Sequence, residues 1–195
     1  MDITLTATVD AQRLSAALRS VLPHLAKGKG FPEPLYGVGL TFDGEELCAQ
    51  GSDGQTMAVH RIPAVPAIET GAAVWTAESA KAVMTWAKGL EGDVVIDGTT
   101  LTCGEATIEV ELIDRQYPNV VGIVKKWSHR PAAPAGHDGA YVVGIDPALL
   151  GRFGRTDLTQ HPDDKGNVLF MRVVGPSSPV YVSFGDHFAG LVAVA

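Results

Sequence analysis

Three short apolar runs, separated by two turn sequences, make up residues 35–63, LYGVGLTFDGEELCAQGSDGQTMAVHRIP. The runs are LYGVGLTF, LCAQGS and TMAVHRIP, and the turns between them are DGEE and DGQ. Asp-Gly pairs between short apolar runs are typical of tight turns that join antiparallel strands. This stretch therefore predicts a meander of three strands.

A strand and a helix are predicted just before the meander. Residues 3–9, ITLTATV, alternate apolar with polar side chains, as in a half-buried strand. Asp10 is a candidate N-cap for a helix over residues 11–25. The apolar side chains of that helix recur every three or four positions and so share one face; they are Leu14, Ala17, Leu18, Val21, Leu22 and Leu25.

The order of strand, helix and three strands occurs three times along the chain. The second copy is predicted as a strand over 72–75, a helix over 77–88 and strands over 93–97, 100–104 and 106–113. Residues 125–139 are rich in Pro, Ala and Gly, which is typical of a linker or long loop. The third copy is predicted as a strand over 140–145, a helix over 148–153 and strands over 167–174, 179–184 and 188–195.

Length and composition exclude several classes of protein. The chain has 195 residues, of which 46% are hydrophobic and 19% charged, as in ordinary globular domains. No apolar run approaches the roughly 18 residues that span a bilayer, and two Asp residues stand where a signal peptide would be basic and then apolar. The only cysteines, Cys48 and Cys103, form no disulfide framework or CxxC zinc pattern. We expect a cytoplasmic protein that does not associate with membranes.

The predicted helices differ in charge from the rest of the chain. Residues 11–29, 77–89 and 147–155 carry eight basic residues and one acidic residue, a net charge of +7. Because the whole chain carries -7, the other residues together carry -14. Basic helices can bind phosphates without sequence preference, although solvated helix faces are the alternative interpretation. The candidate DNA contacts are Arg13, Arg19, Lys27, Lys29, Lys81, Lys88, Arg152 and Arg155.

Two motifs resemble the bacterial sliding clamp family, the beta subunit of DNA polymerase III. Residues 35–63 resemble its middle domain, in which a strand, a DGEEL-type acidic turn and an A-T-D-G-x-R-L-A strand lead to a proline. Residues 112–120, LIDRQYPNV, resemble the L-x-D-x-x-[FY]-P-[DN] ending of a domain. The resemblance implies an α+β DNA clamp fold, with repeated strand-helix-three-strand units and the helices on one face of antiparallel sheets.

The resemblance also implies a domain organisation. Residues 1–122 correspond to one complete clamp domain of two units, residues 123–139 to a linker, and residues 140–195 to the second half of the family's last domain. The family's first domain and the first half of its third have no counterpart in this sequence. We therefore expect a reduced clamp with three units in each chain.

In the family, domains join edge to edge into a ring, helices line the hole and an acidic sheet covers the outside. The resemblance thus implies a processivity factor that encircles duplex DNA. Six domains of two units form the family's ring, so three units per chain would need four chains, with the trimer and the dimer left open. The expected partners are double-stranded DNA, a DNA polymerase, clamp-loader or repair proteins, and further copies of the chain.

The family's second functional surface is a hydrophobic pocket for short peptides of its partners. The resemblance assigns this pocket to Leu35, Ser52, Gly54, Gln55, Thr56, Met57, Pro118, Ile123, Val192 and Ala193. An apolar cleft with a polar rim suits a short peptide with hydrophobic anchors. Gln55-Thr56 replaces the family's His-Arg and Val192-Ala193 replaces its Met-Pro, which changes the expected ligand preference.

No pattern in the sequence indicates catalysis, a metal or a cofactor. The six histidines lack ligand spacing, residues 26–30 lack the frame of a phosphate loop, and no nucleophile elbow is present. Trp75 and Trp86 fit core packing better than base stacking. Two alternatives remain: a non-encircling adaptor or decoy that binds clamp-interacting peptides, and an unrelated hydrolase on an α+β scaffold, for which no constellation of residues was found.

Overall fold

The computed structural model describes residues 5–68, 70–129, 144–154, 169–173, 175 and 178–194. The first unit consists of β1 (Thr6–Asp10), α1 (Ala11–Val21), the 3-10 turns η1 (Leu22–His24) and η2 (Glu33–Tyr36), β2 (Gly37–Phe42), β3 (Glu46–Ser52) and β4 (Thr56–Pro63). The second consists of β5 (Gly71–Thr76), α2 (Ala77–Lys88), β6 (Asp93–Asp97), β7 (Thr100–Cys103) and β8 (Ala106–Glu109). The predicted order of elements is confirmed for both units.

The third unit follows a helix that was not predicted. This helix, α3 (Val120–Ser128), is followed by α4 (Pro147–Phe153), β9 (Phe170–Arg172), β10 (Val180–Phe184) and β11 (Phe188–Val192). The strand predicted over 140–145 falls mainly outside the described residues, and its last two positions are not in a strand.

The end of α1 and the start of the predicted linker differ from the predictions for local reasons. Asp10 caps α1 by accepting a hydrogen bond from the Arg13 N–H at 2.9 Å, as predicted, but the α-helix ends at Val21 because Pro23 lacks the N–H that would continue it. In α3, Asn119 accepts from the Gly122 N–H at 2.8 Å, and Val120 and Val124 form a buried face. The first residues of the predicted 123–139 linker are therefore helical.

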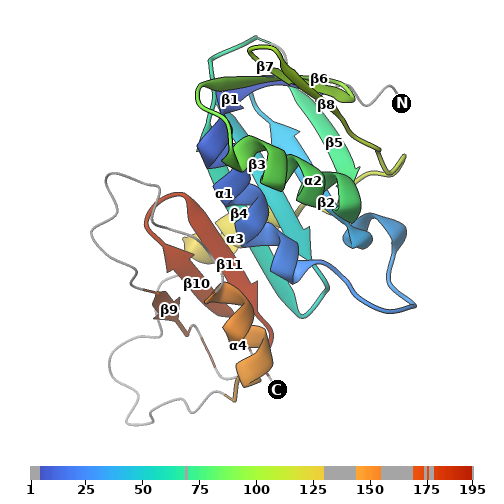
Figure 1. Cartoon of the computed structure of the whole chain (residues 1–195). Helices are drawn as coiled ribbons and strands as arrows, with labels where there is room; N and C mark the ends of the chain where they lie inside the picture. The colour runs from blue at the N-terminus through green and yellow to red at the C-terminus, as the bar shows by residue number, and fades with distance from the viewer. Residues whose placement is uncertain are drawn as a thin grey trace.

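The strands form two antiparallel sheets (Figure 1). One sheet has the order β1-β6-β7-β8, and the other has the order β5-β2-β3-β4-β11-β10-β9. The first two units exchange strands: β1 pairs with β6 of the second unit, and β5 pairs with β2 of the first. The third unit extends the larger sheet through the pairing of β11 with β4.

Helices lie on both faces of the larger sheet. α1 and α2 pack side by side on one face, where the Ser15 hydroxyl donates to the carbonyl of Met84 at 2.8 Å (Figure 1). Along β4, Ala58 belongs to the core beneath these helices, whereas Val59 belongs to a smaller cluster with α3. Because successive residues of a strand point to opposite faces, α3 covers the face opposite α1 and α2.

Close packing joins the third unit to the first. The fully buried ring of Phe153 lies 4.4 Å from the His24 ring and 6.1 Å from the Phe188 ring, measured between centroids. Gly190 allows this approach, because a Cβ atom there would lie 2.5 Å from the Phe153 ring. α4 is thereby held against β11 and the end of η1.

Candidate nucleic-acid interface

Four of the candidate DNA contacts in the first two units lie on α1 and α2, which cover the same face of the larger sheet. Arg13 and Arg19 lie on α1 and are half-buried, and Lys81 and Lys88 lie on α2 and are exposed. Lys27 and Lys29 are also exposed. They were counted with the predicted helices, but they lie in the segment after η1, outside any helix. Arg155 lies outside the described residues.

A cavity of about 470 Å³ separates the end of α1 from α2. Three of the basic residues, Arg19, Lys27 and Lys81, contribute to its lining. Its apolar wall includes Leu22, Leu25, Ala77 and Met84. The cavity thus brings together three cations from two units, an arrangement that attracts phosphate groups without reading bases.

Arg152 is positioned differently from the other predicted DNA contacts. Its guanidinium donates to the carboxylate of Asp53 and, at 3.0 Å, to the hydroxyl of Thr56. Burial alone would raise the pKa of Asp53, but hydrogen bonds from Arg152, Thr56 and Gln55 outweigh it and lower the pKa. Arg152 therefore joins α4 to the β3–β4 turn, and this ion pair partly neutralises its charge toward DNA.

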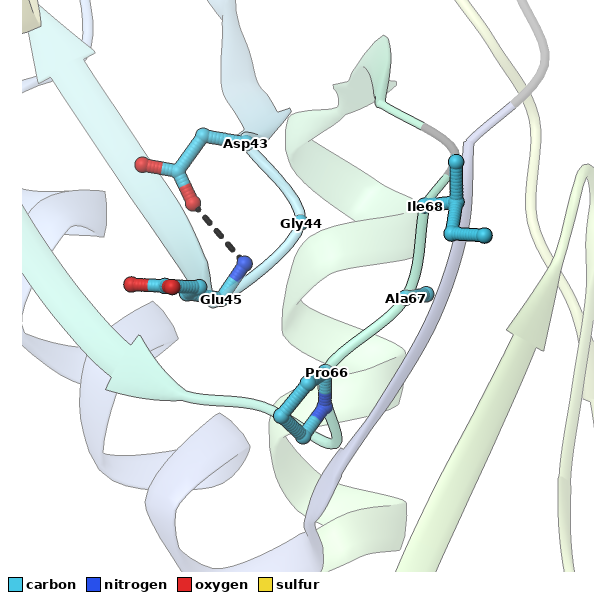
Figure 2. A pocket seen from close by; sticks show the side chains of 6 residues that line it. All are labelled: Asp43, Gly44, Glu45, Pro66, Ala67 and Ile68. Atoms are coloured by element: carbon cyan, nitrogen blue, oxygen red, sulfur yellow. Dashed lines mark hydrogen bonds between the residues drawn. The ribbon is translucent and has the colours of Figure 1, made fainter.

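An acidic pocket lies at the β2–β3 turn (Figure 2). Its volume is about 480 Å³, and Asp43 and Glu45 line it together with the segment from Pro66 to Ile68. Asp43 accepts hydrogen bonds from the N–H groups of Glu46 at 2.9 Å and Glu45 at 3.1 Å, which lower its pKa. Both carboxylates repel phosphate, so this end of the molecule does not suit DNA.

The structure brings several predicted peptide-pocket residues together at the junction of the first and third units. Gln55 and Met57 belong to the β3–β4 turn and β4, and the Ala193 N–H donates to the Gln55 carbonyl at 2.8 Å. The register pairs Val192 with Thr56 and Leu191 with Met57. Ser52 and Gly54 lie in the same turn region, and the Gly54 N–H donates to the Ser52 hydroxyl at 3.2 Å.

The pocket residues differ in their accessibility. Thr56 and Val192 are fully buried, so neither can contact a peptide in this conformation. Leu35 is buried in η2. Pro118, just before α3, and Ile123, within it, are exposed, and Met57 is half-buried against the α3 cluster. Met57, Pro118 and Ile123 thus keep accessible apolar side chains at the predicted site.

α3 is the main feature of this site that sequence reasoning missed. Its buried residues Val120 and Val124 pack with Val59, Tyr181 and Leu191 on the face of the larger sheet opposite α1 and α2. The signal was present as an Asn N-cap followed by apolar residues four apart, but the surrounding Pro and Gly residues favoured a linker. α3 covers the sheet beside the predicted peptide site.

Across the described residues, no helix is long and apolar enough to cross a membrane. Over the same ranges, no group of three or more His, Cys, Asp or Glu side chains is arranged to hold a metal ion.

Comparisons of sequence and structure give different results. No family model matches the sequence, and neither does any curated protein. The structure is similar to a putative DNA polymerase III beta subunit from Eubacterium rectale (TM-score 0.75, 12% identity, 98% of this chain and 65% of that one). It is also similar to the DNA polymerase sliding clamp of Pseudomonas aeruginosa, with a TM-score of 0.74, 13% identity, and coverage of 99% of this chain and 66% of that one. The sliding clamp of Bacillus subtilis gives a TM-score of 0.72, 12% identity, and coverage of 98% of this chain and 64% of that one.

These similarities cover nearly the whole chain, which spans just under two thirds of the length of each of these clamps. At 12–13% identity they concern the fold. The predicted α+β clamp architecture is thus confirmed, and the chain has the fold of a bacterial DNA polymerase III beta sliding clamp.

Proposed function

We propose that this chain is a non-catalytic DNA sliding clamp that encircles duplex DNA as a ring of identical chains and tethers replication proteins. The observation that carries the proposal is the charged face of the clamp fold. Arg13, Arg19, Lys81 and Lys88 lie on the two helices of one face, whereas Asp43 and Glu45 lie at a turn of the larger sheet. A duplex passing along the helices would meet cations, and acidic turns would disfavour other orientations.

The proposed contacts are made to phosphates. Lysines on flexible stems suit a clamp, because they can exchange one phosphate for the next while the protein slides along DNA. None of the candidate contacts needs to read a base edge, so binding should be independent of sequence.

Ring closure requires free sheet edges. Within the described residues, β8 ends one sheet and β9 ends the other, and the β4–β11 pair is an example of two units joined edge to edge. Exposed edges associate with other strands unless they are covered, and a closed ring covers them. Four chains would supply the twelve units of a six-domain ring.

The tether is proposed at the surface of Met57, Pro118 and Ile123. A Q-L-x-L-F-type peptide would place its apolar side chains there and bind in the micromolar range. Met57→Asp puts a charge on this surface and should weaken binding at least tenfold in fluorescence polarisation. Val65→Asp, at a residue 52% exposed elsewhere in the fold, is the matched control. Equal peptide affinity in Met57→Asp and the native protein would contradict the proposed tether.

The main test measures retention on DNA and its salt dependence. Protein assembled on a closed circular duplex should stay bound through gel filtration and be released when the circle is cut. The double variant Lys81→Gln/Lys88→Gln should reduce the salt slope of duplex binding by about 0.9 for each lost contact. Lys125→Gln/Lys126→Gln removes two exposed lysines from α3, on the opposite face, and should leave the slope unchanged.

Two results would overturn the encirclement proposal. One is equal retention on circular and cut DNA, and the other is an equal loss of slope in the two double variants. Peptide binding without any DNA retention would instead support the non-encircling adaptor.

A further inference from the structure

The C-terminal unit ends in an open sheet edge that carries exposed apolar side chains. β9 pairs with β10 on one side and, among the described residues, with no strand on the other. Phe170 is 62% exposed and Met171 is 45% exposed. An unpaired edge with large apolar side chains promotes association with other chains.

The first two units show what such an edge binds in this fold. Among the described residues, β2, β6 and β9 occupy the same place in their units, as the first strand after the α-helix. β5 of the second unit covers the edge of β2 that faces away from β3. In the same way, β1 of the first unit covers the edge of β6 that faces away from β7. The two units of a domain thus complete each other by exchanging strands, and only β9 lacks this partner within the described part of the chain.

Burial of equivalent side chains supports the comparison. Met171 lies opposite Val182, a residue of the core beneath the helices, so its side chain points to the helix-covered face. On β2 and β6 that face is closed: Leu40 is 1% exposed and Ile96 is fully buried. Met171 remains open because α4 is the only helix among the described residues from 144 on, whereas the first domain has two.

We propose that the β9 edge binds the C-terminal unit of a second copy of this chain, and that the two units form one composite clamp domain across a two-fold axis. The occupant is a second copy because a clamp unit supplies the sheet edge and helix that the first two units supply to each other. A two-fold arrangement lets both copies bury Met171 and pair their β9 edges at once, and it leaves no further β9 edge exposed.

The composite domain also accounts for the ring. Two chains would hold two complete domains and one composite domain, and two such pairs would hold six. The inference rests on the proposed function only for this count, since the pairing of two copies through β9 does not depend on DNA.

The test compares solution mass between variants by light scattering, from about 1 to 100 µM, a range that covers ordinary protein–protein affinities. The native protein should form a species with an even number of chains, and Met171→Glu should halve its mass or leave a monomer. Ile68→Glu changes a fully exposed apolar residue in another part of the fold and should keep the native mass.

A second measurement guards against misfolding of the Met171 variant. Hydrogen exchange of the amides of residues 170–172 should slow as native protein is concentrated, and should not slow in Phe170→Lys. A native monomer at every concentration would overturn the composite domain. So would a native mass in both of the β9 variants, Met171→Glu and Phe170→Lys. A dimer that is lost in Met171→Glu but never retained on circular DNA would uphold this inference and overturn the proposed clamp.

Discussion

The ion pair between Asp53 and Arg152 should contribute measurably to stability, because it joins α4 to a turn 99 residues earlier in the chain. The Asp53 side chain is 8% exposed, and it also accepts hydrogen bonds from the N–H groups of Gln55 at 3.0 Å and Thr56 at 2.8 Å. Asp53→Asn keeps the size of the side chain and a carbonyl acceptor but removes the charge. The variant therefore tests the charged part of the interaction.

The expected loss of stability in Asp53→Asn follows from the hydrogen bonds and the burial of the Asp53–Arg152 pair. A hydrogen bond to a charged partner contributes about 1.5–3 kcal/mol. Arg152 is 23% exposed, so water recovers part of its solvation when the carboxylate is lost. We expect Asp53→Asn to lower the free energy of unfolding by about 2 kcal/mol. Glu33→Gln is the control, since the Glu33–Arg115 pair is 65% and 64% exposed and such pairs contribute less than about 1 kcal/mol.

The assay is urea denaturation of a double-mutant cycle with Asp53→Asn, Arg152→Met and the pair together. A coupling energy of about 1.5–3 kcal/mol is expected at pH 7. The pKa of Asp53 is lower in the folded protein than in the unfolded chain, so its stabilisation is present above about pH 4 and is lost as the pH falls through the folded pKa. A coupling below about 0.5 kcal/mol, or a coupling that does not weaken as the pH falls from 7 into the acid range where Asp53 is protonated, would refute the argument.

Two further predictions concern buried contacts. Burial and then the charge of Arg152 lower the pKa of His24 from 6.5 to about 3. The folded protein should lose stability as the pH falls from 6.5 toward 3, because the unfolded chain binds a proton that the folded chain does not; His24→Leu should flatten this dependence in urea titrations at pH 7 and pH 5. Gly39→Ala would place a Cβ atom 2.4 Å from the Tyr117 ring. It should therefore lower the melting temperature, at a cost of about 1–3 kcal/mol, whereas Gly151→Ala, with no atom within 4 Å, should not; equal melting temperatures would contradict the contact.

Much of the fold could be predicted from local patterns. The helix over 77–88 was predicted with its observed bounds, because Thr76 is an N-cap and the apolar positions recur at helical spacing. The strands of the meander were predicted because Asp-Gly turns separate them. The burial of Trp75, whose side chain has no exposed surface, also agrees with the sequence prediction.

Other features depend on contacts that a linear pattern does not contain. The exchange of β1 and β5 is one example, since alternation identifies a strand but not the sheet that it joins. Arg152 is another: the charge count placed it with the DNA contacts, and only the fold shows its pairing with Asp53. Similarly, nothing local distinguishes Thr56 and Val192, which are fully buried, from an accessible lining of a peptide pocket.

The pairing of Met57 with Leu191 has a consequence for how the protein is made. β4 is synthesised early, but the strand that completes its edge follows more than a hundred residues later. At about 5–20 residues per second, a ribosome leaves that edge uncovered for on the order of ten seconds. During that time the nascent first domain can fold while still offering a strand edge to its neighbours, so yield in cells should depend on chaperones and on translation speed across the intervening segment.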